Sequence, residues 1–460
     1  MKYIKNLQIA YIGGGSKGWA WKLMSDLVLE EQLSGTIKLY DIDYEAACNN
    51  QIIGNNLNKQ KGLKSRWKYE AVETLKDTLI GADFIIISIL PGTFKDMDSD
   101  INLPQKYGIY QSVGDTTGPG GLIRGLRSIP MFIDIAKSIS SYSPKAWVIN
   151  YTNPMALCVR ALYVTFPNIK AFGCCHEVFS TQSLLIDMLR DLCDIDGIKR
   201  EDIKINVLGI NHFTWIDHAT YQDIDLMPLY SKFVKKYFKE GFERVGRGSW
   251  KDSYFNSAER VKFDLFKRYG LIAAAGDRHL AEFFPGQWYL KDAKVIESWK
   301  FHLTPVDWRI KRGEELARKS MKLISGKETF NIKPSGEEGV KQIKALLGLG
   351  DLITNVNLPN QGQLKDIPDD SIVETNAVFR KDYIRPVLSG FLPYELNNLV
   401  VRNLYNQETI LKAVLNKDKK LAFAAFVNDS LVGISLGKAK NLFEEMLQAT
   451  KEYLPEWGKH

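Results

Sequence analysis

Four reactive side chains follow one another in the segment GCCHEV, which occupies residues 173–178. Cys174 and Cys175 supply thiols, His176 supplies an imidazole, and Glu177 supplies a carboxylate. Thiolate and neutral imidazole are ordinary ligands of divalent transition metals, so one of these cysteines and a further histidine can hold a catalytic ion. The alternative is that both cysteines are small buried apolar residues, as free cysteines usually are.

The further histidine is His212, in the segment GINHFTW at residues 209–215. Both reactive segments follow runs that alternate between apolar and polar residues, at 169–172 and 203–209, as short strands do. Open α/β sheets bind their ligands at the carboxyl ends of strands. We therefore expect the thiols and His212 to lie at strand ends.

A glycine-rich turn lies near the beginning of the chain. Residues 7–12 predict a strand, the segment GGGSKG follows at 13–18, and a helix with an apolar face comes next. This order satisfies the G-x-G-x-x-G dinucleotide fingerprint, in which glycines let the backbone approach a pyrophosphate. A second strand at 36–40 ends in Asp41, 23 residues after Gly18, where a carboxylate can bind ribose hydroxyls and disfavours a 2′-phosphate. The alternative is a turn that binds nothing, but the context favours an NAD site made by Gly13, Gly14, Gly15, Ser16, Gly18 and Asp41.

Two more strands are predicted in this half. Residues 84–90 form a continuous apolar run, as parallel strands buried on both faces do, and Pro91 ends the run where the cofactor is expected. Residues 146–149 form the other strand, and the helix after it is expected to start at Pro154 with Asn153 as its N-cap. A ligand contact by Asn153 is compatible with that capping role.

The chain divides into two parts by pattern. Residues 1–195 predict one NAD-binding, Rossmann-like, doubly wound α/β domain. Residues 196–460 predict a C-terminal α+β lobe for substrate, metal and oligomerisation, packed closely against the first because no low-complexity linker separates them. In this lobe a helix at 255–271 is followed by the polar cluster GDRHLAE at 276–282, for which a salt-bridged helix start is the alternative.

Composition excludes several classes of protein. The 460 residues are 45% hydrophobic and 25% charged, and the net charge of +7 is spread along the chain without a basic block. This is typical of a globular protein that binds neither nucleic acid nor membrane, since no apolar run reaches the roughly 20 residues that span a bilayer. Five cysteines without framework spacing and a start without a signal peptide favour the cytoplasm.

An NAD fingerprint with a possible metal site first suggests a sugar or alcohol dehydrogenase, in which the ion polarises an alcohol while a hydride leaves. Such an enzyme would accumulate NADH. A protein that only senses NAD would explain the fingerprint but would leave the polar clusters unused.

Several strings together resemble glycoside hydrolase family 4, whose members use NAD and usually manganese without net redox change. They are IGGGS at 12–16, GDTTGPGG at 114–121, NYTNP at 150–154, CHEV at 175–178 and GINH at 209–212. Within that family the chain resembles bacterial α-galacturonidases most, through GCCHEVF at 173–179, LGINHFTW at 208–215, GDRHLAEF at 276–283 and NVN at 355–357. The resemblance covers nearly the whole chain.

The resemblance implies roles for individual residues. Cys175 and His212 match the manganese ligands, and Cys174 departs from the family pattern, which leaves the choice between the two thiols open. Asn153 matches the residue that touches sugar hydroxyls, and His176 occupies the position of the acid. The base is Asp277 or Tyr269, since family members differ between an aspartate and a tyrosine.

The resemblance also implies a reaction and a substrate. The family oxidises the sugar at C3 with NAD, removes the C2 proton, eliminates the aglycone, adds water at C1 and returns the hydride; the paired carboxylates of most glycosidases are not required. The expected substrate is a terminal α-linked galacturonic acid on a pectin-derived oligosaccharide, with α-glucuronides, α-galactosides and α-glucosides as alternatives. A homodimer or homotetramer is expected. The uronate carboxylate needs a cationic partner, and the candidates are Arg124, Arg127, Arg278 and His279.

Overall fold

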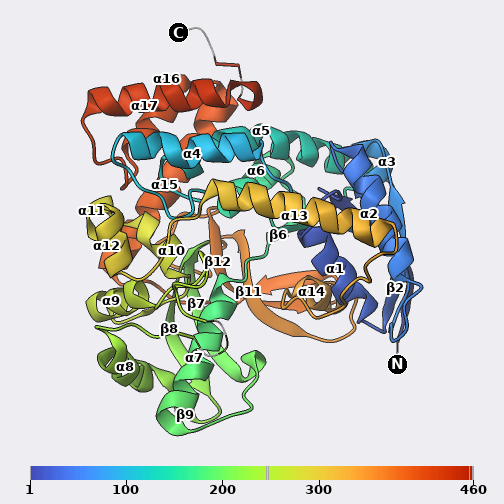
Figure 1. Ribbon diagram of the computed structural model, residues 1–460, viewed down its shortest axis with the longest axis horizontal. Helices are drawn as coiled ribbons and strands as arrows, with labels where there is room; N and C mark the ends of the chain where they lie inside the picture. Colours follow the sequence, from blue (N-terminus) through green and yellow to red (C-terminus); the bar gives the residue numbers. More distant parts are fainter. Residues whose placement is uncertain (1, 245, 247, 455, 458–460) are drawn as a thin grey trace.

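The computed structural model describes residues 2–244, 246, 248–454 and 456–457. Its largest feature is a nine-stranded sheet with the order β13-β12-β11-β6-β5-β4-β1-β2-β3 (Figure 1). Six of these strands pair in parallel, in the order of a dinucleotide-binding fold. They are β1 (Ile4–Ile12), β2 (Leu33–Tyr40), β3 (Trp67–Ala71), β4 (Phe84–Ile87), β5 (Trp147–Asn150) and β6 (Lys170–Gly173). The predicted doubly wound α/β fold is confirmed.

Helices cover both faces of these six strands, and β4 shows why its sequence is apolar throughout. Ile85 and Ile87 pack into one apolar cluster with α5, whereas Phe84 and Ile86 pack into another with α1 and α2. A strand buried on both faces has no position for a polar side chain. The helices of this half are α1 (Trp19–Val28), α2 (Tyr44–Leu57), α3 (Leu75–Leu79), α4 (Phe94–Lys106), α5 (Gly118–Tyr142), α6 (Met155–Thr165) and α7 (Glu177–Cys193).

Three strands of the same sheet come from the second half of the chain. They are β11 (Leu352–Pro359), β12 (Ile372–Arg380) and β13 (Tyr383–Pro386), and each pairs antiparallel with its neighbour. β11 joins the sheet at β6, where Asn357 lies opposite Gly173. The sheet therefore crosses the predicted division at residue 195, and that division stays a prediction.

A smaller sheet, of order β10-β8-β7 with β9 paired to β8, carries His212 at its hairpin. Its strands are β7 (Ile203–Ile210), β8 (Phe213–Tyr221), β9 (Ile224–Asp225) and β10 (Ile272–Ala273). The apolar residues of α7, α8 (Leu226–Tyr237) and α9 (Arg260–Tyr269) pack against it. Among the residues that the structure describes, no helix is both long enough and apolar enough to cross a bilayer.

The remaining helices belong to the second half of the chain, and α16 and α17 lie over α4 and α5 (Figure 1). The long helix α13 packs against α2 and α4, and the C-terminal helices α15, α16 and α17 pack against α5. These helices are α10 (Asp277–Leu280), α11 (Gly286–Tyr289), α12 (Ala293–Ser298), α13 (Val306–Ile324), α14 (Gly339–Leu346), α15 (Tyr394–Asn416), α16 (Lys419–Val427) and α17 (Leu436–Ala449), with 3-10 turns at Arg200–Asp202, Ala281–Phe283 and Lys451–Tyr453.

Candidate active site

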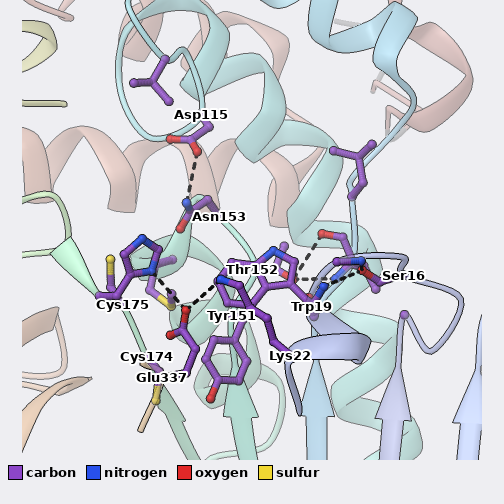
Figure 2. A pocket seen from close by; sticks show the side chains of 18 of the residues that line it. Ser16, Trp19, Lys22, Asp115, Tyr151, Thr152, Asn153, Cys174, Cys175 and Glu337 are labelled. Carbon is purple, nitrogen blue, oxygen red and sulfur yellow. Dashed lines mark hydrogen bonds and ion pairs between the residues drawn. The ribbon is translucent and has the colours of Figure 1, made fainter. Parts of the chain in front are cut away.

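A cavity of about 1750 Å³ lies at the carboxyl ends of the parallel strands. It is lined by the turns that follow β1, β4, β5 and β6, and by loops from the second half of the chain. The glycine-rich turn and the Cys-Cys-His-Glu segment therefore open into the same space (Figure 2). This is where open α/β sheets bind ligands.

The turn after β1 fits a dinucleotide. Gly13 has φ +92°, and a Cβ there would lie 2.1 Å from the carbonyl oxygen of Ser88, the residue after β4, so only glycine fits. The Gly15 backbone N–H donates to Asp41 Oδ2 at 2.9 Å, which fixes that carboxylate beside the turn. Ser16 Oγ accepts from the N–H of Trp19, the first residue of α1, at 3.2 Å. The helix N-terminus and the turn form the cradle that a pyrophosphate needs.

Most of the predicted cofactor residues line the cavity. The lining includes Gly13, Gly15, Ser16, Gly18 and Asp41. Gly14 and Pro91 are buried beside it instead. The Gly14 N–H donates to the Tyr40 carbonyl, and the neighbours of Pro91, Leu90 and Gly92, line the cavity in its place.

Three side chains form a cluster with the spacing of metal ligands. Asp115, His212 and His279 each bring one ligand atom within 4.8 Å of the other two. The imidazole rings of His212 and His279 lie 3.7 Å apart between centroids and are tilted by 31°, and Thr116 Oγ1 lies 2.7 Å from His212 Nδ1. His212 takes a left-handed backbone conformation, with φ +64°, which turns its ring inward from the hairpin between β7 and β8. Oxygen and imidazole nitrogen together suit Mn²⁺.

Cys175 lies beside this cluster and is not one of its three members. The Glu177 backbone N–H and the Asn211 side chain contact the sulfur of Cys175. Burial raises the pKa of the Cys175 thiol well above its usual value, with the Glu374 carboxylate acting in the same direction. The predicted pair Cys175 and His212 is linked through Asn211, the residue before His212. Cys174 Sγ points elsewhere and donates to Gln342 Oε1 at 3.0 Å.

Neighbouring imidazole groups favour the ionised form of Glu177, which follows the predicted acid His176 in the sequence. Burial alone would raise the pKa of Glu177, but His279, His176 and His212 lower it to about 2, helped by the Gly276 N–H that donates at 2.7 Å. Glu177 is thus an anion held between imidazoles.

The predicted acid His176 lies at the N-terminus of α7 with its side chain half exposed. Its Nδ1 is 3.6 Å from Glu337 Oε1, and Lys22 Nζ lies 3.2 Å from the same oxygen (Figure 2). The ring also stacks at a tilt against Trp19, with 6.3 Å between centroids. Glu337 therefore orients His176 through one ring nitrogen.

The two candidate bases lie in different places. Asp277 lines the cavity, and its carboxylate accepts from the backbone N–H groups of Val261 and Lys262. Burial raises the pKa of Asp277 to about 7, Glu259 acts in the same direction, and Lys262 opposes it. Tyr269 lies outside the lining and packs edge-on against Trp215. The structure brings Asp277, and not Tyr269, to the cavity.

The predicted substrate residues form a chain of contacts. Asn153 Nδ2 donates to Asp115 Oδ2 at 3.1 Å, and Arg124 Nε donates to the Asn153 carbonyl at 3.0 Å (Figure 2 draws the first contact). Among the described residues, Asn153 Oδ1 is buried without a partner, which fits a ligand hydroxyl. The predicted N-cap role of Asn153 is wrong: Pro154 precedes α6, and the Asn153 side chain makes no capping hydrogen bond.

The remaining three candidate partners of the uronate carboxylate are placed differently. Arg278 lines the cavity, donating from Nε to the His302 carbonyl at 3.2 Å and from Nη2 to the Ser112 carbonyl at 3.0 Å. His279 belongs to the metal-ligand cluster. Arg127 is engaged elsewhere, in a buried ion pair with Asp100.

Sequence reasoning missed roles for Asp115, Glu177 and Glu337. Asp115 lies in the motif GDTTGPGG and Glu177 in the motif CHEV. The signal that could have identified both is an acidic side chain next to a glycine or a histidine within a motif. Glu337 lies in a stretch without any motif, so no local sequence pattern predicts its contact with His176.

The chain matches two protein-family models. Residues 8–191 match the family 4 glycosyl hydrolases, and residues 207–432 match the C-terminal domain of the same family. The α-galacturonidase of Thermoanaerobacterium saccharolyticum is 62% identical over 454 residues, covering 99% of this chain and 98% of that protein.

Solved structures agree with the fold. The crystal structure of lplD from Bacillus subtilis superposes with a TM-score of 0.93 at 54% identity, covering 96% of this chain and 100% of that chain. A 6-phospho-α-glucosidase from gut microorganisms, solved with NAD and Mn²⁺, has a TM-score of 0.82 at 21% identity, covering 98% of this chain and 100% of that chain, a likeness of fold. The two family models, the relative and the cavity agree, and the chain belongs to glycosyl hydrolase family 4.

Proposed function

We propose that this chain is an α-galacturonidase that releases terminal α-linked galacturonic acid from pectin-derived oligosaccharides with the help of NAD and Mn²⁺. The observation that carries the proposal is a single cavity that contains the glycine-rich turn, the metal-ligand cluster and cationic arginines together. The 62% identity to an α-galacturonidase over nearly the full chain supports the choice of sugar.

The residues fit both cofactors. Gly13, Gly15 and Asp41 would hold the pyrophosphate and ribose of NAD, and Asp115, His212 and His279 with Cys175 would supply ligands for Mn²⁺. When bound, NAD would supply a hydride acceptor and donor for the sugar, and Mn²⁺ would supply a Lewis acid for the sugar oxygens.

The remaining steps belong to side chains. Asn153 would hold a sugar hydroxyl with the free Oδ1 of its amide. Asp277 would take the C2 proton on a carboxylate oxygen, because it lines the cavity whereas Tyr269 does not. His176, steadied by Glu337, would give a proton to the departing glycosidic oxygen.

The first prediction follows from the return of the hydride. Hydrolysis of p-nitrophenyl α-galacturonide should require NAD and a divalent metal, yet absorbance at 340 nm should show no stoichiometric NADH. The measurement compares nitrophenol release with NADH in the same sample. Steady NADH accumulation with an oxidised sugar would instead support a sugar dehydrogenase.

The substrate is checked by ranking glycosides. The kcat/KM for the α-galacturonide should exceed those for α-galactoside, α-glucuronide and a 6-phosphoglycoside. A phosphorylated or neutral sugar that is cleaved equally well would point to another member of the family.

We also propose that the protein is cytoplasmic and assembles as a homodimer or homotetramer. All five cysteines are free, in keeping with a reducing compartment. Large apolar side chains are exposed just after the edge strand β13, including Leu388, Phe391 and Tyr394, and such groups often mark interfaces. Light scattering on the purified protein measures the assembly.

A further inference from the structure

Arg309 is a cation of the cavity wall without an anionic partner. It lies in the first turns of α13 and lines the cavity. Among residues 2–244, 246, 248–454 and 456–457, no carboxylate lies within ion-pair distance of its guanidinium, and its buried Nε has no hydrogen-bond partner. Leaving a buried N–H donor without a partner costs free energy, so such a donor is kept where a ligand completes it.

Arg278 lies near Arg309: burial lowers the pKa of Arg278 to about 10, and the charge of Arg309 acts in the same direction. Both guanidinium groups lie near the ring of Phe255, with their central carbon atoms 5.1 Å and 5.9 Å from its centroid. Phe255 also lines the cavity. Two like charges near one apolar ring repel each other, and an anion bound in the cavity that both arginines line would offset this repulsion.

The pair is held in place before any ligand arrives. Two carbonyl groups, those of His302 and Ser112, accept from Arg278 and leave its Nη1 for a ligand. Arg309 is carried by a long helix, and Trp308 beside it packs edge-on against Phe255 at 5.1 Å. Arginine forks match the two oxygens of a carboxylate, and a pre-organised fork loses little entropy when it binds.

We propose that Arg309, together with Arg278 beside the same Phe255 ring, binds the carboxylate of the uronic acid and so determines that the enzyme prefers galacturonides to neutral galactosides. This inference rests on the proposed function. It assigns the preference to a residue of α13 that lies in none of the sequence motifs quoted for the resemblance.

The test replaces Arg309 with methionine, which keeps the length of the stem and removes the charge. The kcat/KM for p-nitrophenyl α-galacturonide should fall about tenfold or more, mainly through KM, because charge-assisted hydrogen bonds are lost. The kcat/KM for p-nitrophenyl α-galactoside and the Kd for NAD should stay within about twofold. Arg309→Lys, which keeps the charge without the fork, should fall between wild type and Arg309→Met.

The matched control is Arg312→Met, one turn along the same helix, where an exposed arginine pairs with Glu315. It should leave both substrates unchanged. The proposed carboxylate binding by Arg309 and Arg278 is here called the clamp. Equal losses of galacturonide and galactoside activity in Arg309→Met, or unchanged galacturonide activity, overturn it. If Arg309→Met does not fold, the same comparison in Arg309→Lys decides: an unchanged ratio of the two substrates overturns the proposal.

The wild-type enzyme separates this inference from the proposed function. A wild type that cleaves the galactoside as well as the galacturonide overturns the proposed function and the clamp with it. If the wild type prefers the galacturonide to the galactoside and Arg309→Met keeps that preference, the clamp is overturned and the proposed function stands.

Discussion

The two adjacent cysteines, Cys174 and Cys175, point their thiols toward different partners. Cys175 Sγ faces Asn211 and the backbone of Glu177, whereas Cys174 Sγ donates to Gln342 on α14. Neighbouring residues with the same chemistry therefore face different partners. Of the two sulfur atoms, only that of Cys175 faces the hairpin that carries Asn211 and His212.

Replacement of these side chains should separate ligands from neighbours. Cys175→Ser and His212→Ala should lose the bound ion, whereas Cys174→Ser should keep it because one thiol suffices at the site. Metal content measured by elemental analysis on the three purified variants checks this. Loss of the ion from Cys174→Ser alone would reverse the assignment of the two cysteines.

At the scale of elements, one buried carboxyl holds the loop that carries Asp115. Glu282 Oε1 accepts from the backbone N–H groups of Val113 at 2.7 Å and Gly114 at 3.0 Å. Burial raises the pKa of Glu282 to about 8, against the lowering effect of these two N–H groups. The loop is thus fastened to the turn after α10 by a group that folding keeps protonated.

The pH dependence of stability follows from that shift. Since the folded pKa exceeds the ordinary value of about 4.3, the contribution of Glu282 is complete below that pH and is lost as pH rises through about 8. Glu282→Gln keeps the acceptor and has no proton to lose. It should melt close to wild type at about pH 5 and several degrees higher at about pH 9, where the charge costs on the order of a few kcal/mol.

Thermal denaturation of both proteins across that range checks the difference. A variant that is less stable than wild type at every pH would mean that Glu282 is ionised in the folded protein. The comparison between the two proteins cancels the titration of other buried groups.

Elements with a strong periodic pattern could be predicted, and contacts between distant segments could not. The apolar run at 84–90 and the fingerprint turn correspond to β4 and to the turn after β1, because local sequence determines both. The pairing of β11 with β6 joins residues 357 and 173, and no local pattern encodes such a partner. Arg309 and Glu337 were missed for the same reason, since their roles depend on where α13 and the segment before α14 pack.

At the scale of the whole molecule, the two halves of the chain share one sheet and one cavity. The segment before α14 also packs on α1, where Ser25 Oγ donates to the Lys333 carbonyl and Asp26 accepts from the Ser335 N–H. Lys344 pairs with Glu30 at 3.0 Å. Without the second half of the chain, the surface of α1 that these contacts cover would therefore be exposed to solvent.

A fragment of residues 1–195 should for that reason fail to fold cooperatively. It would expose the edge of β6 and the apolar face of α1 that the second half covers. Circular dichroism melting and NAD binding, measured beside the full chain as control, check this. A fragment that binds NAD and melts in one sharp transition would show that residue 195 ends an independent domain.

The ribosome synthesises the neighbouring strands β6 and β11 at widely separated times. β6 is complete at residue 173, and its partner β11 begins only at residue 352, so at about 5–20 residues per second the ribosome leaves the β6 edge open for roughly 10–40 s. An open edge offers unpaired N–H and C=O groups to any other strand, including the same segment of a neighbouring nascent chain. The speed of translation between these two residues therefore sets how long each molecule is exposed to misassembly, whatever the stability of the finished fold.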